Sequence, residues 1–376
     1  MPFRPEGPPR PWGKVAVVGV GLIGGSLCLS WRRRDLVREV WGVDRSPEVL
    51  EEARRRGAVD RATLDLGEGV AGAELVVLAT PVETILRIGE EELPRVLSPN
   101  ALVTDVGSTK GEICRRLSRA LAGRGVFIGG HPLAGSEDQG IAAAHPHLFE
   151  NAVFVLTPSE GTPEGALRDL AALVSTTGAE VVFMDPDLHD RVVAMVSHLP
   201  QMVAVALVNA VERASEAIPG LMDMAAGGFR DTTRITSSPP DIWKDILLTN
   251  REAALEALAL FRENLGRIEE AVRLGNGKAI FEEFSRARET RARLPRRPKG
   301  LIPPSFDIGV SVPDRPGIIY QVTGILAREG MNIRDIEILR LREGEGGALR
   351  LGFSSEEERE KALSLLSQAG YEVRRR

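Results

Sequence analysis

Three glycines, Gly19, Gly21 and Gly24, are spaced as G-x-G-x-x-G. A run of β-branched residues precedes them, and an apolar segment that can form a helix follows. Asp44 ends the next expected strand, 20 residues after Gly24. In this arrangement the glycines allow a tight turn and close approach to a pyrophosphate, while the acid accepts hydrogen bonds from a ribose. The spacing predicts a dinucleotide-binding unit; the alternative is an ordinary βα unit with a glycine turn.

The same segment indicates which dinucleotide binds. Asp44 can accept hydrogen bonds from the adenosine ribose hydroxyls, which favours NAD over NADP. Arg45 follows directly and could instead meet a 2′-phosphate, so NADP stays open as the less favoured cofactor. Thr80 and Pro81 end another expected strand, where the nicotinamide ribose would lie. We expect cofactor contacts from Gly19, Gly21, Leu22, Ile23, Gly24, Asp44, Arg45, Thr80, Pro81 and Ser108.

His131 follows an expected strand in the segment GGHPLAGS, at the sheet edge where the cofactor would lie. A histidine there can accept a proton from a substrate hydroxyl while hydride leaves the same carbon. The alternative is a turn histidine that caps the backbone. Ser108, after the preceding strand, could hydrogen-bond both His131 and that hydroxyl. It could also be a helix N-cap, and both roles are compatible.

Two further side chains are candidates for binding substrate. Arg234 has the planar fork that suits carboxylates, although an ion pair with Asp231 competes with that role. His198 lies between two apolar segments, where a satisfied core histidine is the alternative. The other three histidines show no clustering typical of a metal site, so we expect no metal; they are His145, His147 and His189.

Length and composition limit the class of protein. The 376 residues suit two or three domains, and the net charge is −5 without a basic stripe, which argues against nucleic-acid binding. We find no apolar run near the roughly 20 residues that span a membrane, and no signal peptide. Cys28 and Cys114 lie far apart, as expected of buried thiols in a reducing cytoplasm.

Three domains are expected. Residues 12–184 alternate short apolar strands with helices, which predicts a Rossmann-type α/β fold with a doubly wound parallel sheet. Residues 185–293 form an all-α domain. Its segments 192–196 and 202–208 are apolar nearly all round, so they must be buried in a core or against another subunit, and we expect a homodimer through this domain. A linker at 294–304 precedes a βαββαβ unit at 305–376.

These motifs follow the order found in prephenate dehydrogenases of tyrosine biosynthesis that carry a C-terminal ACT domain, and the chain after Gly13 resembles that family. The matching segments are 19–24 with Asp44, 105–110, 131–135, 185–190, 197–200, 227–234 with Trp243, and 314–317 with 332–333. The resemblance implies that prephenate is oxidatively decarboxylated to 4-hydroxyphenylpyruvate as NAD+ is reduced.

The resemblance also implies roles for individual residues. His131 would take the ring-hydroxyl proton and Ser108 would orient it, while Arg234 would bind a carboxylate and His198 would lend polar support. The expected substrate-binding residues are Arg234, His198, Gln201, Glu137 and Asp231. Gln201 departs from the histidine of many prephenate-using relatives, so arogenate dehydrogenase or dual-specificity cyclohexadienyl dehydrogenase activity stays open.

The ACT-like unit resembles domains that bind an amino acid, and tyrosine would be the inhibitory effector. Its expected contacts are Asp314, Arg315, Pro316, Gly317, Asn332 and Ile333. Two other readings remain. One is a β-hydroxy-acid dehydrogenase that uses a lysine such as Lys244, and the other is a non-catalytic sensor of NAD and amino acids.

Overall fold

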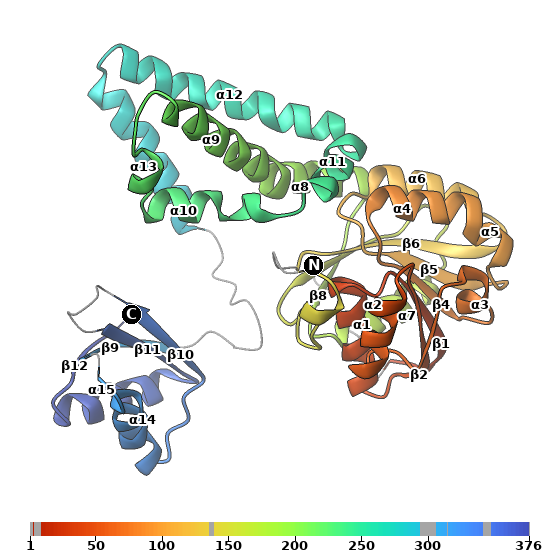
Figure 1. Ribbon diagram of the computed structural model, residues 1–376, viewed down its shortest axis with the longest axis horizontal. Coiled ribbons are helices and arrows are strands. Elements are labelled where there is room, and N and C mark those ends of the chain that lie inside the picture. Colours follow the sequence, from red (N-terminus) through yellow and green to blue (C-terminus); the bar gives the residue numbers. More distant parts are fainter. Residues whose placement is uncertain are drawn as a thin grey trace. The chain divides into compact units, whose positions relative to one another are not determined.

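The computed structural model describes residues 3, 9–134, 139–293, 306–313, 315–340 and 347–375. The chain divides into two compact units, Met1–Leu294 and Pro295–Arg376. The first contains an α/β sheet and a set of helices, and the second contains a smaller sheet with two helices (Figure 1).

The sheet of the first unit has eight strands in the order β3-β2-β1-β4-β5-β6-β7-β8. This order, with β1 in the middle and successive strands added on either side, is that of a doubly wound sheet. The strands are β1 (Trp12–Val18), β2 (Val37–Val43), β3 (Arg61–Thr63), β4 (Leu75–Leu78), β5 (Ala101–Asp105), β6 (Gly125–Pro132), β7 (Val153–Thr157) and β8 (Glu180–Phe183).

Helices cover both faces of this sheet because successive side chains of a strand point to opposite sides. Val15 and Val17 of β1 belong to one buried cluster, and Ala16 and Val18 belong to the other. The helices are α1 (Leu22–Arg33), α2 (Pro47–Arg55), α3 (Leu66–Val70), α4 (Val82–Arg87), α5 (Leu93–Val96), α6 (Gly111–Ala120) and α7 (Glu164–Ser175), with a π-helical turn at Ile88–Glu92 between α4 and α5.

One strand pair differs from the expected parallel sheet: β7 runs antiparallel to β6. His131 pairs with Val155 and Pro132 with Phe154, so β7 begins at the edge where β6 ends. The described part of the connection holds only the short 3-10 turn Ile141–Ala143, and no helix there crosses the sheet. A return from the same edge must produce an antiparallel neighbour. The remaining strand pairs of this sheet are parallel.

A second set of helices follows β8. They are α8 (Pro186–Val193), the π-helical turn η3 (Ala194–His198), α9 (Leu199–Ser215), the 3-10 turn η4 (Met222–Met224), α10 (Gly227–Thr233), the 3-10 turn η5 (Arg234–Ser237), α11 (Pro240–Thr249), α12 (Arg251–Arg273) and α13 (Gly277–Ala292). Helix α11 lies beside α4 of the sheet region (Figure 1), and its Thr249 contacts Thr109. This places the end of α11 close to the loop that precedes α6.

The helical run from Pro186 to Ser215 corrects the expectation that no segment is long and apolar enough to cross a membrane. By length and composition it meets that test, although only a third of its most apolar window is buried. Pro200 lies in the first turn of α9, directly after the π turn η3, where a proline without an N–H is tolerated. Two apolar segments thereby join into one helix.

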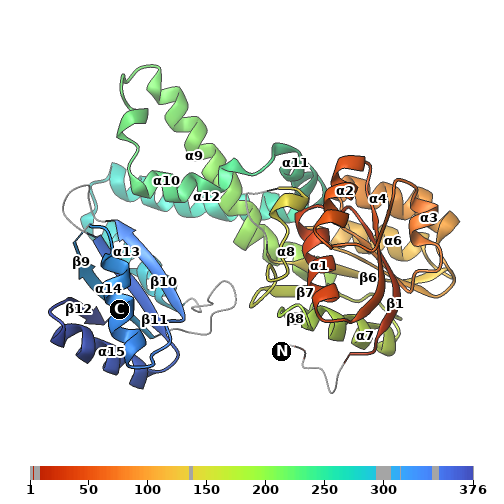
Figure 2. The ribbon, with the colours of Figure 1, turned by 60° about the horizontal axis from the view of Figure 1, so that its bottom comes forward.

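The second unit is a four-stranded antiparallel sheet in the order β10-β11-β9-β12. Its elements follow the expected βαββαβ order: β9 (Phe306–Val312), α14 (Ile318–Arg328), β10 (Asp335–Arg340), β11 (Gly347–Phe353), α15 (Glu356–Gln368) and β12 (Glu372–Arg375). Both helices lie on one face (Figure 2), and their apolar side chains pack against Ile308, Val310 and Val312 of β9. Ser355 caps α15, as its sequence predicts.

We expect a substitution of Gly24 by alanine to destabilise the first unit. A Cβ at Gly24 would lie 2.1 Å from the carbonyl oxygen of Gly19, and because this atom is backbone, α1 must move away from β1. The loss is about 1–3 kcal/mol of unfolding free energy, measured by urea denaturation.

Gly165→Ala is the matched control, because a Cβ there meets no atom within 4 Å and the residue is already helical. This variant should gain about 0.4–1 kcal/mol. Equal urea midpoints for Gly24→Ala and the unsubstituted chain would contradict the close packing of α1 on β1.

Candidate active site

The N-terminus of α1 forms a cradle for an anionic group. Gly21 is its N-cap, with no side-chain cap and no acid in the first turn. The N–H groups at the start of a helix lack partners within the helix and carry partial positive charge. Gly19 has φ = 93°, and a Cβ on Gly21 would meet no atom within 4 Å, so backbone faces open space there. These features fit a pyrophosphate.

Asp44 and Thr80 follow β2 and β4, the two strands that flank β1 and the cradle. The carboxylate of Asp44 accepts hydrogen bonds from Val20 N at 3.0 Å and from Ser46 N at 3.1 Å, which fixes it at the end of β2. Arg45, the alternative contact, is exposed. Among the described residues, the buried hydroxyl of Thr80 has no hydrogen-bond partner, and a bound ribose would supply one. The residues present therefore fit a dinucleotide.

A buried ion pair fixes the end of β5. Lys110 and Asp105 are both fully buried, and the ammonium group of Lys110 contacts Asp105 Oδ2. The same carboxylate accepts Gly107 N at 2.8 Å and Gly130 N at 3.1 Å. It therefore joins the loop that carries Ser108 to the residue that precedes His131.

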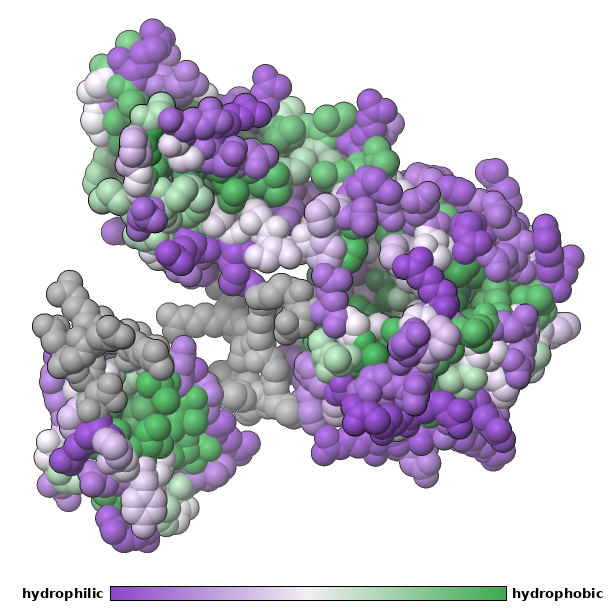
Figure 3. Space-filling model, viewed as in Figure 1, coloured by the Kyte–Doolittle hydropathy of each residue, from purple (hydrophilic) through white to green (hydrophobic). Residues whose placement is uncertain are grey.

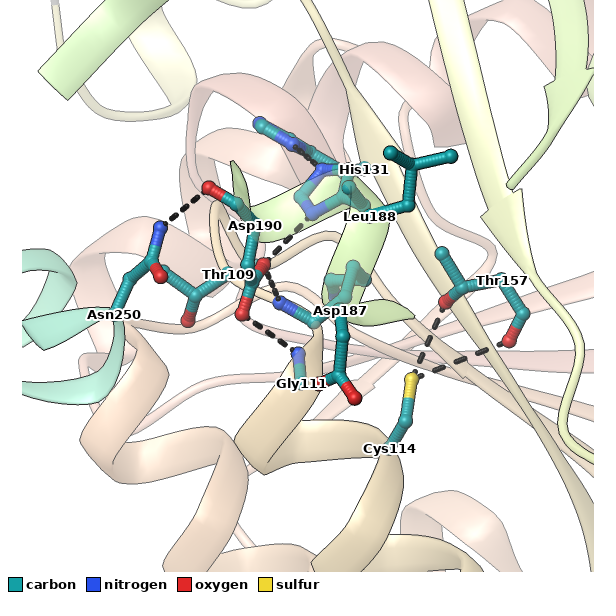
Figure 4. Close-up of polar contacts among 12 residues, drawn as sticks. Thr109, Gly111, Cys114, His131, Thr157, Asp187, Leu188, Asp190 and Asn250 are labelled. Atoms are coloured by element: carbon teal, nitrogen blue, oxygen red, sulfur yellow. Dashed lines mark hydrogen bonds and ion pairs between the residues drawn. The ribbon is translucent and has the colours of Figure 1, made fainter. Parts of the chain in front are cut away.

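Two histidines and an aspartate form a continuous chain of hydrogen bonds beside this pair. His131 Nδ1 lies 2.8 Å from His189 Nε2, and His189 Nδ1 lies 2.8 Å from Asp190 Oδ1. The Asp190 carboxylate also accepts Lys110 N at 2.7 Å and Gly111 N at 2.8 Å, at the start of α6 (Figure 4). The chain thus connects β6, α8 and α6.

Asn250 extends this network to His198. Its Nδ2 donates to the backbone oxygen of Asp190 at 2.8 Å and lies 3.3 Å from His198 Nδ1. Because the amide nitrogen only donates, Nδ1 of His198 is the acceptor and Nε2 carries the proton. Trp243 meets the His198 ring edge-on, with ring centroids 6.0 Å apart. His198 therefore belongs to a polar cluster and is also buried, which combines the two alternatives for this residue.

Helix α11 contacts the sheet region at two points. Asp245 Oδ2 accepts Glu83 N at 3.3 Å, in the first turn of α4 just after Thr80 and Pro81. The hydroxyls of Thr109 and Thr249 lie 2.9 Å apart, next to Ser108. One helix therefore touches both strand ends that carry expected cofactor residues.

Burial lowers the pKa of both histidines in the cluster. The pKa of His131 is well below its ordinary value of 6.5 because the ring is desolvated and because His189, Lys110 and His198 lie close by. Desolvation likewise lowers the pKa of His198 to about 4, with a further lowering by His189 and an opposing effect of Asp190. Both rings are neutral at pH 7, and a neutral imidazole can accept a proton.

One expectation for Ser108 is wrong, because it is not the N-cap of α6. This helix begins at Gly111, and Asp190 of α8 supplies the carboxylate for its first N–H groups. The partner of His131 Nδ1 is His189, and a hydrogen bond between Ser108 and His131 stays a prediction. Ser108 itself is half-buried on the loop between β5 and α6.

The expected substrate residues lie on several elements of the first unit. Gln201 is buried on α9, three residues beyond His198. Arg234 begins η5 and is exposed, as is Asp231 at the end of α10. Glu137 lies outside the described residues.

His189 is the residue that sequence reasoning missed. It was set aside with His145 and His147 for lack of a metal-like cluster, and the described residues do contain no group of three or more metal-binding side chains. The signal in the sequence was its direct neighbour Asp190, a carboxylate that can orient an imidazole. Nothing local shows that the pair faces a strand end some 58 residues earlier in the chain.

The expected effector residues gather at the start of α14 and before β10. Gly317 has φ = 84° and is the N-cap of α14, a conformation that favours glycine. Arg315 is exposed and donates to Gln321 at 3.0 Å, and Asn332 is exposed before β10. Asp314 lies outside the described residues.

Comparison with known proteins identifies all three parts of the chain. Residues 27–183 match the model for the prephenate dehydrogenase nucleotide-binding domain, 185–286 that for its dimerization domain, and 306–369 that for the ACT domain. Prephenate dehydrogenase of Bacillus subtilis is 38% identical over 360 residues, which is 96% of this chain and 97% of the relative.

Solved structures agree with this likeness. Prephenate dehydrogenase of Aquifex aeolicus in complex with hydroxyphenyl propionate and NAD+ superimposes with a TM-score of 0.70 at 34% identity, over 75% of this chain and 97% of that one. Arogenate dehydrogenase of Synechocystis gives a TM-score of 0.65 at 36% identity, over 74% and 99%. The expected resemblance and fold class are confirmed, and the chain belongs to the prephenate dehydrogenase family, in the form that carries a C-terminal ACT domain.

Proposed function

We propose that this protein oxidatively decarboxylates prephenate to 4-hydroxyphenylpyruvate with reduction of NAD+, in tyrosine biosynthesis. The observation that carries the proposal is a neutral imidazole, His131, fixed by a buried hydrogen-bond chain at the sheet edge that also carries the dinucleotide cradle. Ligands of doubly wound sheets bind at this edge. Family membership supports the same reaction.

The residues of the site account for the proton of the reaction. NAD+ supplies the acceptor for the hydride that leaves the ring carbon bearing the hydroxyl. His131 accepts the hydroxyl proton, the bond to the ring carboxylate breaks, and its electron pair completes the aromatic ring as CO2 leaves. The ring oxygen then takes the proton back, so His131 ends neutral. The first step needs an unprotonated imidazole, which the lowered pKa of His131 provides.

Charged side chains would orient the substrate for this step. Arg234 presents a guanidinium that can bind a carboxylate bidentately, and in this proposal it holds a carboxylate of the substrate, with Asp231 three residues before it in the chain. Ser108 hydrogen-bonds the ring hydroxyl, and His198 offers its Nε2 proton to the substrate. Positioning of the substrate supplies much of the rate enhancement, because the hydride and the carboxylate that leave are both already bonded to the same ring.

Arogenate is the alternative substrate. Gln201 is buried and neutral beside the histidine cluster, so it repels the ammonium group of arogenate less than a cationic residue would. The likeness to an arogenate dehydrogenase supports keeping this alternative. A β-hydroxy-acid dehydrogenase is less well supported, because Lys244 is 55% exposed and pairs with Glu83 and Asp245 at the surface.

We also propose a cytoplasmic homodimer formed through the helices of residues 185–293. Apolar side chains are exposed along these helices, where Figure 3 shows hydrophobic surface over α9 and α12. A second copy would cover this surface, including the apolar run Pro186–Ser215. The exposed residues include Val196, Val205, Leu255, Leu265, Phe281 and Phe284. The domain boundaries in this proposal are 12–184, 185–293 and 305–376, with a linker at 294–304.

Tyrosine is the proposed effector of the second unit. No side chain caps the start of α14 at the left-handed Gly317, and Asn332 lies exposed before β10. An amino-acid carboxylate is the kind of group that such N–H groups bind. The sensor hypothesis shares this site but leaves the histidine cluster without a purpose.

His131→Asn should lower kcat with prephenate by about 10²–10⁴-fold, because asparagine cannot accept a proton. NAD+ binding should be unchanged, since no cofactor contact is lost. The measurement is NADH absorbance with prephenate or arogenate, each with NAD+ and NADP+, plus a binding titration. His147→Gln is the control and should keep full activity, because His147 contacts Arg33 at the C-terminal end of α1. Turnover of simple hydroxy acids but not of prephenate would refute the proposed reaction.

The pH profile should show that the base stays unprotonated in mild acid. Because the pKa of His131 is lowered, kcat/KM should remain constant as pH falls from 8 to 6.5, and should decline only below the ordinary value of 6.5. Circular dichroism at each pH excludes unfolding as the cause of the decline. Half-maximal kcat/KM at or above pH 6.5 would contradict a desolvated base.

Tyrosine inhibition should require the second unit. Deletion of residues 300–376 should abolish inhibition, and Asn332→Ala in the full chain should weaken it, with Lys361→Ala on α15 as the control. A coupling of about 1–3 kcal/mol corresponds to about 5–150-fold in affinity. Inhibition that persists after the deletion would instead be competitive and act at the active site.

A further inference from the structure

We infer that His189 and Asp190 are positioning residues that fix the tautomer and the ring orientation of His131, so that its Nε2 is the nitrogen that faces substrate without a proton. This inference rests on the proposed function, in which His131 accepts the hydroxyl proton. Neither residue was assigned a role by its sequence context, and the family matches give them none.

Asp190 determines which atom donates in each hydrogen bond of this chain. Its carboxylate is nearly buried and receives two backbone N–H groups, from Lys110 and Gly111, at the start of α6. Helix N-termini favour a negative charge, and a carboxylate that carries one can only accept hydrogen bonds. The third contact of this carboxylate is His189 Nδ1 at 2.8 Å, and this nitrogen must therefore carry a proton.

The same logic passes on to His131. A neutral His189 with its proton on Nδ1 has no proton on Nε2. His189 is only 1% exposed, and its Nε2 lies 2.8 Å from His131 Nδ1. Two bare nitrogens cannot share a hydrogen bond, so His131 Nδ1 is the donor. The remaining nitrogen of His131, Nε2, has no proton and can act as the base.

The hydrogen bond to His189 fixes both the tautomer and the ring orientation of His131, which a histidine without such a partner would not have. A free imidazole exchanges its proton between two nitrogens, and rotation about χ2 has two broad minima, so only part of the population would present a bare nitrogen to substrate. The rings of His131 and His189 meet edge-on, with planes at 73° and centroids 5.0 Å apart, which leaves one orientation. Preorganisation of this kind raises kcat without changing substrate affinity.

The anchor of the pair is independent of the base itself. Asp190 is held through its side chain by α6 and through its backbone oxygen by Asn250, whose amide lies at 2.8 Å (Figure 4). His189 and Asp190 are adjacent on α8, which begins at an Asp185 cap with two backbone hydrogen bonds. The pair is therefore rigid whether or not substrate is bound.

The opposite proton arrangement is a defined alternative. If His189 carried a proton on both nitrogens, its Nε2 would donate, His131 Nδ1 would accept, and the proton of His131 would lie on Nε2. That form could not accept a proton from substrate at Nε2. The charged groups that face His131 and His189 are Lys110 from the α6 side and Asp190 from α8, with His198 from η3 close by.

The test is ¹⁵N NMR of the full-length protein with selectively labelled histidine, which is practical because the chain contains five histidines. We expect His131 to show a protonated Nδ1 and a bare Nε2 at pH 7, in the absence of substrate. His131→Asn and His189→Gln assign the signals. A protonated Nε2 on His131 overturns the inference, whatever reaction the enzyme catalyses.

Steady-state kinetics of two variants of His189 are the second test of the positioning role. His189→Leu should lower kcat by about 10–100-fold, as loss of an orienting partner does elsewhere, with KM for prephenate and NAD+ unchanged. His189→Gln should recover part of kcat, because its amide oxygen can accept from His131 Nδ1 and its amide nitrogen can donate to Asp190. His147→Gln, which breaks another histidine–carboxylate contact, is the matched control.

The outcomes separate this inference from the proposed function. Equal kcat for His189→Leu and the unsubstituted protein, or equal losses in both His189 variants with raised KM, would overturn the positioning role. If His189→Leu does not fold, the tautomer of His131 in His189→Gln and in the unsubstituted protein still decides. An enzyme with no activity on prephenate but with the expected tautomer would refute the function and leave the hydrogen-bond chain intact.

Discussion

The Asp190 carboxylate connects the helical region to the sheet, and the geometry of the site depends on it. It takes two N–H groups from the start of α6 and one from His189, while its backbone oxygen receives Asn250. Each of these donors is buried, and a buried donor without a partner costs about 1–3 kcal/mol. The position of α8 relative to β6 is therefore set by hydrogen bonding as well as by apolar contact, and His131 lies at that junction.

A second buried charge, on Lys110, completes the frame. Burying Lys110 with Asp105 carries a large desolvation cost, which mutual attraction and the N–H groups of Gly107 and Gly130 offset. The result is a loop and a strand end that cannot move independently. Lys110 also contributes, after desolvation and His189, to the lowered pKa of His131, so the ion pair that fixes the strand end also favours a neutral imidazole there. Structural and chemical roles coincide in these few residues.

Much of the fold could be predicted because its signals are local. The glycine spacing at 19–24 predicts a turn. Short apolar runs that alternate with helices predict strands, and the right-handed crossover rule predicts that these strands pair in parallel. The second unit has the expected βαββαβ order of elements. The antiparallel β7 could not be predicted, because strand direction depends on where the connection runs. The π turn at Ala194–His198 could not be predicted either, because a proline such as Pro200 normally indicates the start of a new helix rather than a π turn before it.

The sequence by itself determined the cofactor cradle, the candidate base His131 and the family, because each depends on residues that are close in the chain or on motifs in a fixed order. Only the tertiary structure decided what orients that base. Ser108 is the partner that the order of the strands suggests, because it follows the strand before that of His131, whereas His189 and Asp190 reach His131 from a helix some 58 residues later. The physical reason is that a hydrogen bond requires a distance of about 2.8 Å between donor and acceptor atoms. The number of residues between two side chains does not determine that distance, which is set only when the helices pack on the sheet.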